Sequence, residues 1–368
     1  MTKHIFGINL KKQWHFDSIN QMINQLPLSL QTLYAELIDQ CASADFERDF
    51  PANGNFVRKD RKGRRYWYFQ ATIDGRQSQK YVGPETPQLL HRIETHRQAR
   101  SAAKGRREMV QALRRARMPY PEEYAGALLT ALSEAGIFRL RTVLVGTMAY
   151  QTYAPLLGVR FPGQTLRTGD IDLAQFRDIS ILVEDQTPSV IDVLKKVDPT
   201  FREVPYGMDS RRAVAYRSAR GYRVEFLTPN KGPDTDEPQN LPALGTDAQP
   251  LRFLDFLIYD YVSAAILHGE GIFVNVPAPQ RYALHKLIVA RRRREGAAKI
   301  DKDLQQAGTL LEVLAAKRSI DLRSAWQDLN AKGRKWRQLL AEGLAMLPVE
   351  IRAATLDAVG DVLTLEKA

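Results

Sequence analysis

The chemistry that this chain could perform depends first on two acidic residues and on the turn that precedes them. Asp170 and Asp172 are two residues apart in an extended segment, so their carboxylates project from the same face. Such a pair suits a hard divalent cation such as Mg²⁺, which binds carboxylate oxygens at about 2.1 Å and keeps open positions for substrate phosphates. The Gly146-Thr147 turn, between an apolar run and a helix-like segment, offers backbone N–H groups and a hydroxyl to an anion. A phosphate-binding turn beside a cation site predicts nucleotide chemistry.

A third acid, Glu225, lies in a later segment whose side chains alternate in character from Tyr222 to Leu227, which is typical of a strand. An acid in such a strand costs free energy to bury unless it is paired or binds a metal. Two interpretations stay open. Glu225 forms an ion pair with Arg223 or another arginine, or it lies on a neighbouring strand and completes a carboxylate triad with the two aspartates.

Taken together, these residues resemble the nucleotidyltransferase fold of the DNA polymerase β superfamily. They are most similar to the bacterial branch that includes AbiEii-type toxins and abortive-infection nucleotidyltransferases. A helix-like segment at 282–294 carries a Lys286-Leu287 pair followed by arginines, and a Lys302-Asp303 pair comes later, as in that branch. The resemblance covers roughly residues 138–311. Two departures are an inserted loop at 158–168 and a glutamate at position 225, where aspartate is more frequent.

The resemblance implies an Mg²⁺- or Mn²⁺-dependent enzyme that transfers a nucleoside monophosphate from an NTP to an acceptor hydroxyl by two-metal phosphoryl transfer. The resemblance to toxins and phage-defence enzymes implies a tRNA-like RNA as the acceptor. It also implies a neutralising antitoxin as a protein partner. The residues it assigns are Asp170, Asp172 and Glu225 for catalysis and metal binding, and Gly146, Thr147, Lys286 and Arg293 for nucleotide binding.

Other functions remain open from the residues alone. One is a nucleic-acid-binding regulator with an inactive transferase fold. Others are nucleotidylation of a protein or a small molecule, and a metal-dependent nuclease that uses the same acids. The class of acceptor separates the enzymes from one another, and dependence on NTP separates them from the nuclease.

Composition limits the cellular setting. The 368 residues, 44% hydrophobic and 26% charged, predict a globular chain of two or three domains. No apolar run of about 18 residues could span a bilayer. The amino terminus lacks the apolar core of a secretion signal, and a single cysteine excludes an intramolecular disulfide. We therefore expect a cytoplasmic protein without membrane partners.

Positive charge is concentrated in the first third of the chain. The net charge is +11, and residues 91–118 hold nine Lys or Arg against two acids, while residues 56–81 hold eight against two. Residues 56–57, 65–73 and 77–82 predict three short strands, in which aromatic and basic residues alternate as in surfaces that bind nucleic acid. The opposing interpretation is that half of these aromatic residues are core and that residues 87–117 form one solvated helix. The basic residues that we expect to contact nucleic acid are Arg64, Arg65, Arg76 and Lys80.

Strands that alternate with helices and then follow one another predict an α+β fold, in which a mixed nucleotidyltransferase-like sheet has flanking helices. We predict a basic amino-terminal region at 1–120, a catalytic domain at 121–275, and a helical carboxy-terminal domain at 276–368 that contributes Lys286. Within these, composition predicts a loop at 230–250, which is either a lid-like substrate loop or a mobile surface excursion. Apolar periodicity predicts helices at 253–267 and 322–347.

Overall fold

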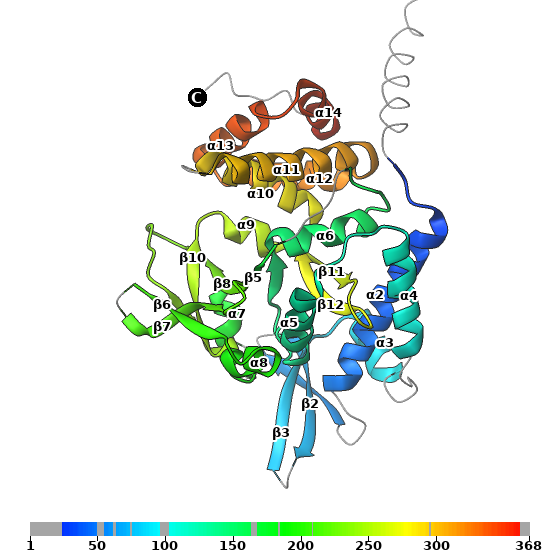
Figure 1. Cartoon of the computed structure of the whole chain (residues 1–368), viewed down its shortest axis with the longest axis vertical. Coiled ribbons are helices and arrows are strands. Elements are labelled where there is room, and N and C mark those ends of the chain that lie inside the picture. The colour runs from blue at the N-terminus through cyan, green and yellow to red at the C-terminus, as the bar shows by residue number, and fades with distance from the viewer. Residues whose placement is uncertain are drawn as a thin grey trace, which may run out of the picture. The chain divides into compact units, whose positions relative to one another are not determined.

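The computed structural model describes residues 24–49, 55–61, 64–73, 76–95, 103–162, 168–182, 185–207, 209–293 and 296–360. The chain folds into two compact units. One contains residues 1–27, 153–163 and 277–368, and the other contains residues 28–152 and 164–276. Among the helices described, none is long and apolar enough to cross a membrane. Figure 1 shows the elements with the labels used below.

The basic amino-terminal segment forms the three predicted strands. β1 (Asn55–Arg61), β2 (Arg64–Ile73) and β3 (Arg76–Pro84) form an antiparallel sheet in the order β1-β2-β3. Phe69 of β2 is buried, and its ring lies 5.0 Å from that of Phe56 in an edge-on arrangement. This sheet therefore has its own apolar contacts.

The helices that precede and follow this sheet in the chain are α2 (Leu28–Asp49), α3 (Pro87–Thr95) and α4 (Ala103–Arg115), and Leu89 and Ile93 of α3 pack against Phe69. α2 begins directly after Pro27, where the missing proline N–H costs no helical hydrogen bond. The single helix predicted at 87–117 corresponds to α3 and α4, and residues 96–102 between them lie outside the described residues. α2 and α4 pack side by side (Figure 1).

The central sheet is mixed, as predicted. β4 (Val143–Val145) pairs antiparallel with β5 (Asp170–Ala174), and β5 pairs parallel with β8 (Arg223–Pro229). The other side of β8 pairs with two strands, antiparallel with β7 (Asp209–Arg217) and parallel with β10 (Thr246–Leu251). β6 (Arg202–Tyr206) pairs with β7, and β9 (Gln239–Leu241) pairs with β10. The α+β class with a mixed sheet is thus confirmed.

The two faces of this sheet differ in burial. Ile171, Val224 and Tyr216 are opposite one another on β5, β8 and β7, and all three are buried. Asp170 and Arg223 occupy the alternate positions and therefore point to the other face. Flanking helices of this unit include α5 (Glu123–Glu134), α7 (Arg177–Leu182) and α8 (Val190–Val197), and α8 packs on α5. Ile171, Val224 and Tyr216 thus belong to the core, and the other face carries the charged side chains of Asp170 and Arg223.

Two predicted elements of this unit were wrong. The segment predicted as a lid-like loop at 230–250 contains β9, the 3₁₀ turn η1 (Pro242–Leu244) and β10, and β10 extends the central sheet. The segment predicted as a helix at 253–267 is a short helix, α9 (Leu254–Tyr259), followed by β11 (Tyr261–Ile266). β11 pairs with β12 (Ile272–Pro277) in a separate ribbon. An apolar run by itself does not separate a helix from a buried strand, which explains the second error.

The carboxy-terminal region is helical, as predicted. Its elements are α10 (Pro279–Arg292), α11 (Ala297–Lys317), α12 (Ser319–Ala331), α13 (Arg334–Ala345) and α14 (Val349–Val359). The single helix predicted at 322–347 was wrong, because Gly333 adopts φ +114° and separates α12 from α13. α10 packs on α11, α12 and α13.

Gly343 allows α13 to approach α10 closely, because a Cβ at this position would overlap the backbone carbonyl of Leu287. Gly343→Ala should therefore lower the free energy of unfolding by about 1–3 kcal/mol, as overpacking of a close contact does. Gly105→Ala is the matched control, since a Cβ at that position in α4 meets nothing within 4 Å. The control should stabilise by up to about 1 kcal/mol through helix propensity. Equal effects of the two changes in a urea titration would contradict this interpretation of Gly343.

Candidate active site

The turn between β4 and α6 (Gly146–Leu156) lies directly beside one of the predicted acids. Gly146 has φ +67°, and a Cβ built on it would overlap the carboxylate of Asp172. Thr147 is buried in the first turn of α6, where backbone N–H groups have no intrahelical acceptor. The turn therefore places the amino-terminal end of α6 next to the Asp172 carboxylate, and only glycine fits at its first position.

Gly146→Ala should reduce nucleotidyl transfer by at least about tenfold, because the added methyl group must displace the Asp172 carboxylate or shift the turn. The measurement is transfer of an α-labelled phosphate from an NTP, with the unfolding transition recorded in parallel. Gly207→Ala is a suitable control for backbone strain, since Gly207 also has positive φ but a Cβ there meets nothing within 4 Å. A Gly146→Ala variant with unchanged activity would show that this close approach does not affect the reaction.

The three predicted acids lie on adjacent strands and on one face of the sheet. Asp170 and Asp172 alternate along β5, and Glu225 of β8 is directly opposite Asp172. Side chains of directly opposite residues share a face, and neighbouring strands are about 4.8 Å apart. Asp170 is exposed, and Asp172 and Glu225 are half-buried. Residues that are more than fifty positions apart in sequence are thus brought together by strand pairing.

Glu225 also forms an ion pair with Arg223, which was the other interpretation of this residue from the sequence. Nη2 of Arg223 donates to Oε1 of Glu225 at 3.0 Å. Burial raises the pKa of Glu225; the positive charge of Arg223 opposes this rise, and the negative charge of Asp170 adds to it. Within the described residues, no three His, Cys, Asp or Glu side chains converge closely enough to hold a metal ion. In this structure Glu225 is instead paired with Arg223.

The donor set nevertheless suits a hard cation. Asp170 and Asp172 supply carboxylate oxygens from one face, which are the ligands that Mg²⁺ and Mn²⁺ prefer. The repulsion between Asp170 and Glu225 is of the kind that a bound cation relieves. The two aspartates would hold the ion. Glu225 would become a further ligand if its ion pair with Arg223 opened.

The residues predicted to bind nucleotide in the other unit form one cluster around a buried carboxylate. Nζ of Lys286 is 2.5 Å from Oδ1 of Asp303, and Nε of Arg293 is 2.7 Å from Oδ2 of the same carboxylate. Asp303 is 2% exposed, and Lys286 also lies 5.3 Å from the ring centre of Tyr282. The structure therefore brings Lys286 and Arg293 together through Asp303.

Sequence reasoning gave Asp303 no role, although the residue was part of the Lys302-Asp303 pair that carried the resemblance. The sequence pattern that could have identified Asp303 is an acid at helical spacing from apolar residues. Asp303, Ala307 and Leu311 of α11 are all buried. Helical spacing puts such a residue among apolar neighbours. A buried carboxylate requires a cationic partner, and here it has two.

The four basic residues predicted to contact nucleic acid lie on β2 and β3. Arg64 and Arg65 are exposed and Lys80 is half-buried, while the side chain of Arg76 lies outside the described residues. Arg65 forms ion pairs with Glu85 at 3.1 Å and with Asp60 at 3.8 Å, so part of its charge is already balanced. Contact with nucleic acid at this sheet stays a prediction.

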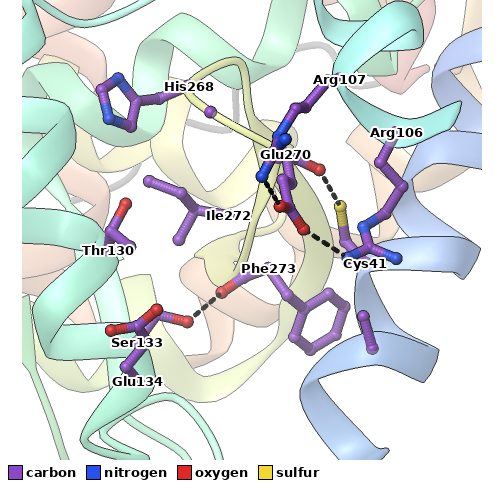
Figure 2. A pocket seen from close by; sticks show the side chains of 13 residues that line it. Cys41, Arg106, Arg107, Thr130, Ser133, Glu134, His268, Glu270, Ile272 and Phe273 are labelled. Atoms are coloured by element: carbon purple, nitrogen blue, oxygen red, sulfur yellow. Dashed lines mark hydrogen bonds and ion pairs between the residues drawn. The ribbon is translucent and has the colours of Figure 1, made fainter. Parts of the chain in front are cut away.

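A cavity of about 560 Å³ lies apart from these residues, bordered by α2, α4, α5 and the β11–β12 ribbon. Figure 2 shows the carboxylate of Glu270 between the guanidinium groups of Arg106 and Arg107. Arg106 is buried, and its Nη2 is 2.8 Å from Glu270. Cys41 donates to the backbone carbonyl of Glu270 at 3.6 Å. These interactions hold the ribbon turn against α2 and α4.

The chain is similar to known proteins in two places. A family model described as Nucleotidyltransferase matches residues 123–331, more than half of the chain. A model described as a domain of unknown function, DUF6788, matches residues 23–91. No curated protein matches the chain.

One solved structure is similar, an antigenic nucleotidyltransferase-like protein from Paracoccidioides brasiliensis. The sequences are 16% identical, the match covers 61% of this chain and 94% of that one, and the TM-score is 0.29. The family match includes the Gly146-Thr147 turn, Asp170, Asp172 and Glu225, together with Lys286. On the strength of that match, the chain belongs to the nucleotidyltransferase family.

Proposed function

We propose that this protein transfers a nucleoside monophosphate from an NTP to a hydroxyl of an RNA acceptor. The observation that carries the proposal is the register of the central sheet, which aligns Asp172 with Glu225 on one side and with Val145, the residue before the Gly146-Thr147 turn, on the other. The family match supports transferase chemistry. The positive charge of the amino-terminal segments supports a polyanionic acceptor.

In this mechanism the helix-end N–H groups at Gly146 and Thr147 bind a phosphate of the NTP. The resemblance assigns Lys286 and Arg293 to the nucleotide as well, and Asp303 holds both side chains. Asp170, Asp172 and Glu225 would hold two Mg²⁺ or Mn²⁺ ions, which supply charge neutralisation at the phosphates and acidify the acceptor hydroxyl. Glu225, whose pKa is raised by burial, would accept the hydroxyl proton.

The products are pyrophosphate and an acceptor that carries one more nucleoside monophosphate. The sequence resemblance adds two further elements to the proposal, a toxin or phage-defence role and a neutralising protein partner. The toxin role is tested by expression: a toxin that modifies RNA would arrest growth, and the arrest would depend on Asp170 and Asp172.

The direct test is incubation with each α-labelled NTP, Mg²⁺ and total cellular RNA, followed by separation of RNA, protein and small molecules. Label in RNA, abolished by chelation of the metal, supports the proposal. Label in protein or in a small molecule would identify a different acceptor class. RNA fragments released without NTP would indicate a nuclease instead.

A second function is favoured by one observation, the ion pair that holds Glu225 to Arg223. If that pair persists, the chain would be an RNA-binding regulator with an inactive transferase fold. Its RNA affinity would fall steeply with salt and would be the same with and without Mg²⁺ and NTP. Label transfer to any acceptor would exclude it.

A further inference from the structure

Three arginines continue the line of the catalytic face away from Asp170. Arg223 of β8 is directly opposite Asp170, Arg217 of β7 is opposite Arg223, and Arg202 of β6 is opposite Arg217. Directly opposite residues share a face, so the four side chains form one row across four strands. We call Arg223, Arg217 and Arg202 the arginine row.

The row becomes more exposed with distance from the acids. The side chain of Arg223 is 43% exposed, and Arg217 and Arg202 are exposed residues. Within the part of the chain that the structure describes, neither Arg217 nor Arg202 has a carboxylate partner. Nε of Arg223 is shielded from solvent and likewise lacks an acceptor there. One shielded donor without an acceptor and two exposed cations on one face form a positively charged surface that suits an anionic ligand.

The position of the row distinguishes the acceptor from the NTP. β5 has β4 on one side, with Val145 opposite Asp172, and β8 on the other. The Gly146-Thr147 turn and the arginine row therefore flank the two aspartates from opposite sides. Phosphoryl transfer places the attacking and leaving oxygens roughly in line on opposite sides of the phosphorus. With the NTP phosphates at the turn, the row is on the side from which the acceptor attacks.

We propose that the arginine row binds the phosphodiester backbone of a single-stranded acceptor, with its terminal hydroxyl at Asp170. This inference rests on the proposed function. It adds where the acceptor binds and which end of its strand lies at Asp170. Neighbouring strands are about 4.8 Å apart, so Arg217 and Arg202 lie about 10 and 14 Å from Asp170 along the row. At about 3.4 Å per phosphate in a stacked strand, the row spans the last few phosphates of the acceptor.

The test is binding of a fluorescent single-stranded RNA of roughly ten nucleotides, measured by anisotropy over a range of salt concentrations with EDTA present. Arg202→Gln/Arg217→Gln should reduce the slope of log K against log [salt] by about 1.4, since each contact with a single strand contributes about 0.7. That change corresponds to a loss of about 10- to 30-fold in affinity at ~0.1 M salt. The affinity for NTP, measured separately by calorimetry, should stay unchanged.

The matched control is Arg177→Gln/Lys195→Gln, which removes the same charge from exposed positions on α7 and α8 of the same unit. An equal loss of RNA affinity in the control, or none in the row variant, would overturn the inference. Weaker NTP binding in the row variant would also overturn it, because the row would then serve the nucleotide. Failure of the proposed function has its own readout, which is absence of label transfer to RNA by the unsubstituted protein.

Discussion

Asp170→Asn and Asp172→Asn are each expected to reduce transfer of an α-labelled phosphate by about a thousandfold. The amide keeps the size of the side chain but removes the charge that the site needs against a cation and phosphates. A metal at such a site contributes several kcal/mol to transition-state stabilisation, and about 4 kcal/mol corresponds to a factor of about 10³. Because Asp170 is exposed and Asp172 is half-buried, the fold should tolerate both changes.

A control variant and two further measurements separate a loss of catalytic activity from a loss of stability or of RNA binding. Asp192→Asn, which changes an exposed carboxylate on α8 in the same unit, should retain full activity. The two site variants should keep their unfolding midpoints, and their affinity for RNA should be equal to or above that of the unsubstituted protein, since a negative charge has been removed. Variants of both aspartates that transfer label within about threefold of the original rate would end the assignment of these residues to catalysis.

Local sequence patterns predicted the parts of the site that depend on local structure. Alternation over residues 222–227 predicted the strand that became β8, and the two-residue spacing of Asp170 and Asp172 placed them on one face. A glycine in the turn was expected for an anion site, and its contact with Asp172 gives an additional reason for glycine there. These features follow from spacings of a few residues, which sequence displays directly.

The remaining features depend on pairing between distant segments, which a single sequence does not display. The arginine row was missed because its members lie on three different strands and meet only through register. β10 was mistaken for a loop because residues 230–250 are rich in Pro, Gly and Asp, although buried and half-buried residues alternate from Thr246 to Pro250. The alternative partners of Glu225 could not be separated for the same reason, since Arg223 and Asp172 are both within reach of its strand position.

Asp303→Asn is expected to have the largest effect on stability. Asp303 is 2% exposed and binds both Lys286 and Arg293, so the amide leaves a mostly buried ammonium group without its counter-charge. Removing one partner of a buried ion pair costs about 3–5 kcal/mol, and the more exposed Arg293 should add little. Denaturant titration should show a decrease of that size in the free energy of unfolding. Asp301→Asn, an exposed carboxylate of α11, is the control and should change stability by less than about 0.5 kcal/mol.

A second substitution separates the electrostatic cause from a packing defect. Lys286→Met in the Asp303→Asn background removes the uncompensated ammonium and should restore a large part of the lost stability, although each single change destabilises. The same double variant should still bind NTP poorly, because the proposal assigns the triphosphate to Lys286. Recovery of stability without recovery of NTP affinity is the expected result. Additive losses of stability would instead show that Asp303 acts through packing, and restored NTP affinity would remove Lys286 from the nucleotide site.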